Sequence, residues 1–219
     1  EKNYPYNISL SWAAPYRARR IREMLKEKEK LNREDFKKIQ NDFYSLRAEK
    51  IISFIRDFNP ESEKAAQALE IIKKWDHVVS ADSGDAAVYE LFLTALIRNI
   101  AEDELGDDLY FYFVNMYKSL IVDDLFSKLN SMLWDRADTS QKETWKEIVE
   151  KSLAEALKQA EMRMGSDRNK WQWGKIHQIF YRHPGAESWI TRQLLNYGPY
   201  PLGGDNTTVN YAGFNPANE

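Results

Sequence analysis

Two histidines and an aspartate in the last quarter of the chain are the side chains with the clearest chemical potential. His177 and His183 lie six positions apart, and on a β-strand this even spacing places both on one face. With Asp205 further along, they could bind a metal ion or act as a general base. However, Pro184 would end the strand directly after His183, and no third ligand follows at a spacing typical of metal sites. We therefore interpret both as hydrogen-bonded histidines at a sheet edge and predict no metal site.

Two glycine-containing segments resemble ligand loops. Residues 203–207 (GGDNT) are similar to a phosphate loop but lack the lysine and the following helix that such loops use. A tight turn with positive φ explains both glycines more simply. Residues 82–85 (DSGD) could hold a nucleophile or a cation, but a capped helix start is the better interpretation. Neither segment predicts a catalytic residue or a cofactor.

Arginines crowd one short segment, at positions 17, 19, 20 and 22. On a helix, Arg17, Arg20 and Ile21 share a face. At least one of these arginines is therefore a candidate to point inward toward a carboxylate partner. A solvated helix remains the default interpretation.

The composition is that of an ordinary globular chain with unevenly distributed charge. The 219 residues are 30% charged and 43% hydrophobic, with a net charge of −3, which gives no general case for a nucleic-acid partner. Residues 17–50 hold twelve basic and seven acidic side chains, and residues 99–138 hold three and nine, as is typical of solvated helix faces. Cysteine is absent, which excludes disulfides and thiol catalysis. No apolar run approaches the about 20 residues of a membrane-spanning helix, so no membrane partner is expected.

Hydrophobic periodicity predicts that most of the chain is helical. Pro15 suits the first turn of a helix, and Asn32 is a candidate N-cap. The aromatic run at residues 110–113 fits either a helix or a strand. The predicted helices are one from residue 15, a long one over 32–58, one starting at 59–61, a central apolar one over 86–104, one over 120–133, and a last long one capped by 138–140 and ended by Gly165.

The architecture is predicted to change at Gly165, because seven of the nine glycines fall at or after this position. Alternating apolar residues predict a strand over 174–181, a turn over 199–204 and a second, β-branched strand over 207–211. The fold class is therefore mainly α with a few C-terminal strands. Three parts are predicted: an extended lead-in (1–14), a helical domain (15–165) and a strand-rich segment (166–219). Because the chain begins at Glu1 without a methionine and ends in loop-like sequence, we expect a fragment.

Several segments, taken together, resemble the penicillin amidase (penicillin acylase) family of N-terminal nucleophile hydrolases. Each piece alone is unspecific, but the series follows the order of the family over essentially the whole chain. The matching pieces are YPY (4–6), Trp12, PYRARRI (15–21), DFKKIQND (35–42) with Ser45 and Ala48, WD (75–76), SADS (80–83), AA (86–87), WGKIH (173–177), FYRHP (180–184), GGD (203–205) and TVN (208–210).

The resemblance implies an internal section of the large β-subunit, with its strands in the family's αββα sheet. In the family, self-cleavage exposes a serine whose hydroxyl attacks an amide carbonyl. Its α-amine is the base, and backbone and asparagine donors hold the oxyanion. Residue 1 here is Glu1, and the family's asparagine precedes the YPY segment, so no catalytic residue maps to this chain. The implied partners are the α-subunit, the nucleophile-bearing part of the β-subunit and a small amide substrate.

One functional position carries over from the family. An arginine that precedes a hydrophobic residue in the first helix lies near the substrate cleft of the family, and it matches Arg20, with Arg17 as the alternative register. The family's calcium-binding carboxylate would fall at Asn7 or Ile8, neither of which is a carboxylate, so no metal is predicted. If the parent protein follows the family, its location is extracytoplasmic.

Two function hypotheses follow. The first is a fragment of an enzyme that hydrolyses linear amides of the penicillin or N-acyl-homoserine-lactone type, inactive as an isolated chain. The second is a stand-alone helical module for binding or scaffolding. Because strands taken out of a larger sheet have unpaired edges, we also expect a tendency to self-associate.

Overall fold

The computed structural model describes residues 6, 14–116 and 124–213. Its elements are, in chain order, α1 (Tyr16–Leu25), α2 (Arg33–Gln40), α3 (Leu46–Ile55), α4 (Glu63–Lys74), α5 (Gly84–Met116), the 3-10 turn η1 (Met132–Trp134), α7 (Trp145–Met164), the 3-10 turn η2 (Arg168–Lys170), α8 (Trp173–Ile176), β1 (Gln178–Tyr181), α9 (Trp189–Leu195) and β2 (Tyr197–Pro201). Within these ranges the fold is mainly α with one two-stranded antiparallel sheet, which confirms the predicted class. The predicted lead-in lies almost wholly outside the described residues.

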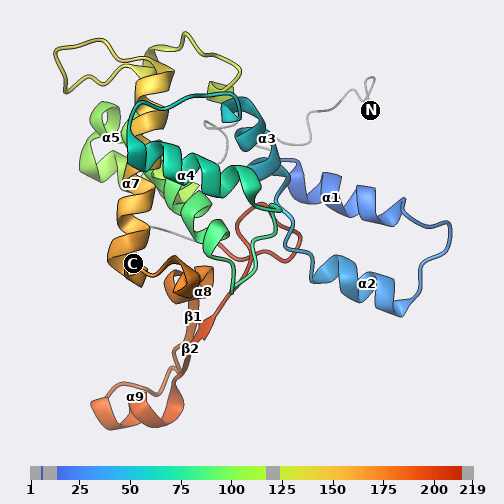
Figure 1. The fold of residues 1–219 in the computed structure, drawn as a ribbon. Helices are drawn as coiled ribbons and strands as arrows, with labels where there is room; N and C mark the ends of the chain where they lie inside the picture. Colours follow the sequence, from blue (N-terminus) through green and yellow to red (C-terminus); the bar gives the residue numbers. More distant parts are fainter. Residues whose placement is uncertain (1–5, 7–13, 117–123, 214–219) are drawn as a thin grey trace.

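The hydrophobic core lies where α4, α5 and α7 pack against one another (Figure 1). Helix α5 is apolar on most of its faces, as the sequence predicted, and Tyr89, Phe92 and Leu96 are fully buried. Residues 82–85 do form a capped start, because Ser83 Oγ accepts the amide proton of Ala86 at 3.0 Å. The aromatic run at 110–113 is helical and continues α5 beyond a kink at Gly106, where φ is +66°. None of the described helices combines the length and hydropathy needed to cross a bilayer.

Two helices flanking α5 begin later than predicted. Helix α4 starts after Ser62, and the Glu150 carboxylate of α7 accepts the amide protons of Glu61 and Ser62 at 3.2 and 2.7 Å. Helix α7 starts after Thr144, which forms a capping box with Glu147. Residues 138–140 were predicted as its cap and instead lie in the preceding loop. At α4 the Glu150 carboxylate satisfies the two backbone amides directly before the helix, and at α7 the Thr144–Glu147 capping box satisfies amides at the helix start.

The single long helix predicted over residues 32–58 is wrong. Asn32 does cap α2 with a capping box, but the chain leaves the helix after Gln40 and re-enters it at Leu46. The intervening segment pairs with residues 77–79: Ser45 N donates to His77 O and Val79 N donates to Phe43 O, both at 2.9 Å. These tertiary hydrogen bonds replace the helical ones that the local pattern predicted.

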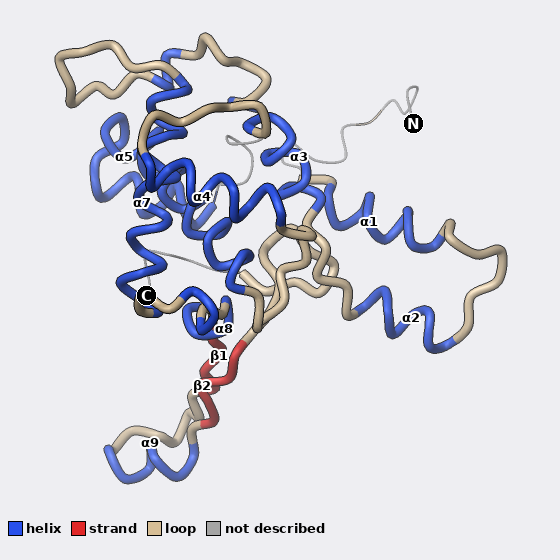
Figure 2. Tube along the Cα trace, viewed as in Figure 1, coloured by secondary structure: helices blue, strands red, loops and turns tan. Residues whose placement is uncertain are grey.

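The predicted strands of the C-terminal segment are only partly correct. Residues 173–176 form the short helix α8, and the strand β1 begins at Gln178. Its partner β2 (Tyr197–Pro201) overlaps the predicted turn, whereas residues 207–211, predicted as a strand, are loop (Figure 2). The helix predicted over 120–133 is also not found within the described residues. Only residues 124 and 125 are α-helical there, and turns and η1 follow.

The β1–β2 ribbon leaves the helical body and carries α9 at its tip (Figure 1). At its base, Gly174 packs so closely that an added Cβ would lie 2.6 Å from Pro201 Cβ and 3.0 Å from the Ala81 carbonyl. Gly204 has φ +82°, so the predicted positive-φ turn is correct for this glycine. At Gly203 an added Cβ would lie 3.0 Å from the Val79 carbonyl oxygen, so this glycine allows close approach of the backbone instead. Close backbone contacts therefore fix the loop 202–212 against the body.

Candidate functional site

The Arg20 guanidinium is held by a carboxylate from the next helical segment. Arg20 Nε lies 2.9 Å from Asp42 Oδ2, and Arg20 Nη2 lies 3.0 Å from Asp42 Oδ1. The Arg20 and Asp42 side chains are 23% and 12% exposed. The hydrogen bond to Asp42 raises the pKa of Arg20, against the opposing effect of burial. The guanidinium therefore stays charged, in a bidentate geometry that leaves its Nη1 group outside the pair.

Aromatic rings support both candidate arginines. The Arg20 guanidinium carbon lies 4.6 Å from the centroid of the Tyr44 ring, and that of Arg17 lies 4.8 Å from the Tyr211 ring. The Tyr44 hydroxyl is 3.5 Å from Nδ1 of His77. Burial raises the pKa of the Tyr44 hydroxyl, with a further contribution from Glu49. A cation above an aromatic face is attracted by about 0.5–2 kcal/mol, so the arginines have defined positions rather than fully solvated ones.

The C-terminal loop reaches this cluster through the backbone. The amide of Asn210 donates to the Asp42 carbonyl at 3.0 Å. Tyr211 follows directly and meets Arg17. Residues about 170 positions apart in the sequence are thereby brought together at the start of α1 and the end of α2. We call Arg17, Arg20, Asp42, Tyr44 and Tyr211 the arginine cluster.

A second polar cluster is fully buried beneath the same loop. The Asp205 carboxylate accepts hydrogen bonds from Arg47 Nη2 at 3.4 Å and from Ser45 Oγ at 3.2 Å. On its other oxygen it accepts from Thr207 Oγ1 at 2.8 Å, from the Thr207 amide and from the Thr208 amide at 2.9 Å. The Arg47 and Asp205 side chains are each 2% exposed. We call these residues the Asp205 anchor.

The electrostatics of the anchor follow from its donors. Burial alone would raise the pKa of the Asp205 carboxyl, because it disfavours the charged form. The Arg47 charge and the hydrogen bonds from Thr207 outweigh burial, and the pKa is lowered from its ordinary value of 3.8. The carboxylate is therefore ionised and bound to its donors over the whole neutral range.

The remaining chemical candidates have structural duties. His177 is buried and its Nδ1 lies 3.1 Å from the Leu202 carbonyl, whereas Nδ1 of the exposed His183 accepts the Gly185 amide at 3.0 Å. Both histidines are hydrogen-bonded, as interpreted, but only His183 follows a strand and they do not share a strand face. Within the described ranges no group of three histidine or acidic side chains could hold a metal ion. Asn7 and Ile8 lie outside those ranges.

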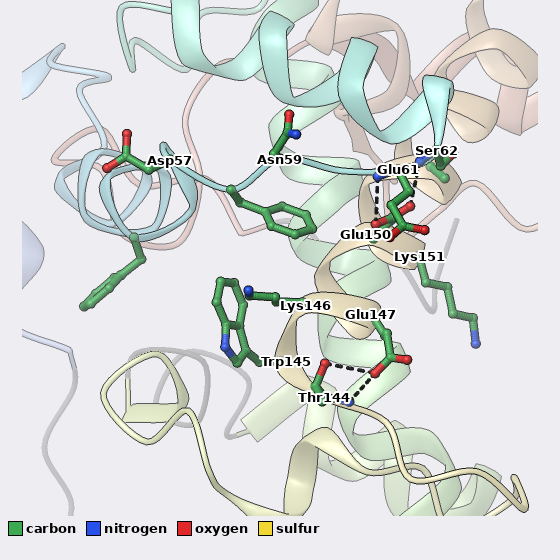
Figure 3. Close-up of a pocket in the computed structure, with 13 residues that line it drawn as sticks. Asp57, Asn59, Glu61, Ser62, Thr144, Trp145, Lys146, Glu147, Glu150 and Lys151 are labelled. Carbon is green, nitrogen blue, oxygen red and sulfur yellow. Dashed lines mark hydrogen bonds between the residues drawn. The ribbon is translucent and has the colours of Figure 1, made fainter.

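A surface pocket of about 1060 Å³ lies between the start of α7 and the segment joining α3 to α4 (Figure 3). Phe58 and Trp145 both line it, and their ring centroids are 5.8 Å apart. Its acids include Glu147 and Glu150, which already cap the N-termini of α7 and α4. The pocket shares no residue with the arginine cluster. These two carboxylates therefore hold helix ends.

Comparison with known proteins identifies the family. The sequence profile described as penicillin amidase matches residues 1–218. The chain belongs to the penicillin amidase family. The resemblance based on short segments is thereby confirmed.

Named relatives within the penicillin amidase family are acyl-homoserine lactone acylases. The chain is 34% identical over 233 residues to acyl-homoserine lactone acylase QuiP of Pseudomonas fluorescens Pf-5, covering 97% of this chain and 28% of the relative. It is 33% identical to the QuiP protein of Pseudomonas syringae pv. syringae B728a, with the same coverages. It is 29% identical to that of Pseudomonas aeruginosa PAO1, covering 98% of this chain and 29% of the relative. The chain thus spans less than a third of the length of these penicillin amidase relatives.

Sequence reasoning singled out Arg17 and Arg20 but missed their partners. Asp42 lies within the DFKKIQND segment, where the only sequence signal is the family pattern. The anchor residues Arg47 and Asp205 were not paired, because they lie 158 positions apart. The presence of an inward-facing arginine with a carboxylate partner is confirmed for Arg20 by its geometry, whereas a role in binding substrate stays a prediction.

The first prediction concerns the strength of the anchor. Replacing Asp205→Asn removes one partner of the buried Arg47–Asp205 ion pair, which costs about 3–5 kcal/mol of unfolding free energy. Urea denaturation followed by circular dichroism measures the loss. The matched control is Glu34→Gln, which removes the exposed Lys37–Glu34 pair and should cost at most about 1 kcal/mol. Equal losses for the two variants would contradict a special role for the anchor.

The second prediction concerns pH. A carboxyl whose pKa is lowered by folding stabilises the folded state above its unfolded pKa, and this stabilisation is lost as pH falls through the folded pKa. The unfolding free energy of the native chain should therefore exceed that of Asp205→Asn by a constant amount from pH 7 down to the ordinary aspartate value of 3.8. The difference should shrink only below that pH. Denaturation series between pH 7 and pH 3 test this, and a difference that already shrinks near pH 6 would refute it.

Proposed function

We propose that this chain is one section of a larger amide hydrolase that removes the acyl group from an N-acylated small molecule, with N-acyl-homoserine lactones as the substrate class. The family match over residues 1–218 and the acylase relatives support this proposal. The low coverage of those relatives supports the idea that further parts of the enzyme exist. The N-terminal serine nucleophile belongs to one of those parts.

The observation that carries the proposal is the geometry of Arg20. Asp42 engages Nε and Nη2 and fixes the plane of the guanidinium, and Tyr44 fixes its position from one face. The Nη1 group lies outside this pair and is the natural donor to an oxygen of the substrate. A carbonyl or lactone oxygen accepts such a charged hydrogen bond, which contributes about 1.5–3 kcal/mol. Arg17, above Tyr211, provides a second positive charge on the same helix.

In this proposal the chain positions substrate and the missing part performs the chemistry. The serine hydroxyl attacks the amide carbonyl, the leaving amine takes a proton, and water then releases the acyl group from the ester. The residues of this chain contribute orientation, because a substrate held by Arg20 presents its amide at one place. No residue of the arginine cluster acts as nucleophile or base.

The third prediction tests the division of labour. We expect the isolated 219-residue chain to give only background release of amine from an N-acyl-homoserine lactone or a chromogenic phenylacetyl amide. The reading frame that contains it, expressed whole, should hydrolyse one of these substrates. Clear turnover by the isolated chain would refute the proposal. A whole protein without any amidase activity would favour the alternative of a helical binding module.

The fourth prediction tests Arg20 in the whole enzyme. Arg20→Ala should lower kcat/KM about ten- to a hundredfold, the equivalent of losing one charged hydrogen bond in the transition state. Arg22→Ala is the matched control, because Arg22 lies on the exposed side of the same helix and should leave the kinetics unchanged. Steady-state kinetics of folded variants give the answer. Identical kinetics for Arg20→Ala and the native enzyme would remove Arg20 from the site.

A further inference from the structure

The segment 178–201, made of β1, α9 and β2 and called the arm below, exposes an unusual share of apolar side chains. Seven of the seventeen large hydrophobic side chains that are exposed in the described residues belong to the arm, which is 24 residues long. Every residue of β2 is exposed, and α9 buries none. The seven are Phe180, Tyr181, Trp189, Ile190, Leu194, Tyr197 and Tyr200.

The arm has no core of its own. A two-stranded ribbon is at best marginally stable in water without a further layer, and here neither strand has another neighbour within the described residues. Helix α9 carries Trp189, Ile190 and Leu194 at its surface with exposed fractions of 75, 62 and 73%. A concentration of exposed large apolar side chains on one segment is typical of an interaction site.

The base of the arm, by contrast, is rigidly joined to the body. Trp173 is fully buried and its indole N–H donates to the Gly204 carbonyl at 3.2 Å. The amide of Leu202 donates to the His177 carbonyl at 3.0 Å. Gly174 lets Pro201 approach closely. The arm therefore leaves the body in one fixed direction and presents its apolar side chains there (Figure 1).

We propose that the arm is the surface by which this chain docks onto an apolar face of the remaining part of the same enzyme. This inference rests on the proposed function and identifies where the parts meet. The lengths of the relatives favour the rest of the enzyme as the docking partner. The match covers 97% of this chain but only 28% of the relative. The low charge of the arm also favours this partner, since Arg182, Glu187 and Arg192 are the only Lys, Arg, Asp or Glu residues within positions 178–201. A weakly charged surface rich in aromatic residues is typical of the buried centre of a protein–protein interface.

Limited trypsin digestion tests the docking. Arg182 and Arg192 lie in exposed parts of the arm, so the isolated chain should be cut at both sites while its helical body, which has its own core, stays intact. In the whole enzyme the same two sites should be cut at least tenfold more slowly. Mass spectrometry of the fragments reads out both. Equal cleavage rates in the isolated chain and the whole enzyme would overturn the proposal.

Variants sharpen the test. Replacing Ile190→Ser and Leu194→Ser together should restore cleavage at Arg182 and Arg192 in the whole enzyme. The control Met162→Ser changes a residue of α7 that is 68% exposed, and it should leave the arm protected. If the double variant does not fold, the comparison of native whole enzyme with native isolated chain still decides the matter.

Experiments on the isolated chain would detect two other possible partners of the arm, a second copy of the chain and a lipid surface. Protection of the arm with a dimer mass in light scattering would assign the surface to a second copy and overturn the proposal. Arm-dependent flotation with phosphatidylglycerol vesicles would assign it to a lipid surface, with the same consequence. The digestion pattern does not depend on turnover, so loss of the docking proposal and loss of the proposed amidase function are separate outcomes.

Discussion

The buried Asp205 carboxylate is the interaction on which the arrangement of this chain depends. It lies in the loop after the arm, yet its donors include Ser45 and Arg47 at the start of α3. Removing a carboxylate from water costs several kcal/mol, and the five donors offset that cost only when all of them are in place. The anchor therefore fixes the position of the loop relative to α3, although the two segments are distant in the sequence.

The arginine cluster inherits its geometry from this anchor. Ser45, which caps α3 and contacts Asp205, follows Tyr44, the ring beneath Arg20. From the other side, the loop fastened by Asp205 supplies the Asn210 amide to Asp42 and the Tyr211 ring to Arg17. A site that must hold a guanidinium steadily needs supporting residues that are themselves fixed. The buried anchor provides that support for an otherwise half-exposed surface cluster.

The body and the arm differ in where their apolar side chains lie. In the body, α4, α5 and α7 bury their apolar faces against one another, so the helices stabilise themselves. In the arm, backbone hydrogen bonds between β1 and β2 define the shape, while the apolar side chains remain in solvent. A closed core together with one open apolar extension is consistent with the proposed role as a section of a larger enzyme.

The sequence by itself determined the features that depend on local order. Periodicity predicted the helical body and the apolar α5, short segments indicated the family, and helix geometry placed Arg17 and Arg20 on one face. The tertiary structure decided the break at residues 41–45, the pairing of β1 with Tyr197–Pro201 and the Asp205–Arg47 contact across 158 positions. Helical hydrogen bonds join residues four apart and leave a periodic trace in the sequence. A buried ion pair or a pair of strands joins residues that are far apart in the sequence, and no local pattern indicates which residue will be the partner.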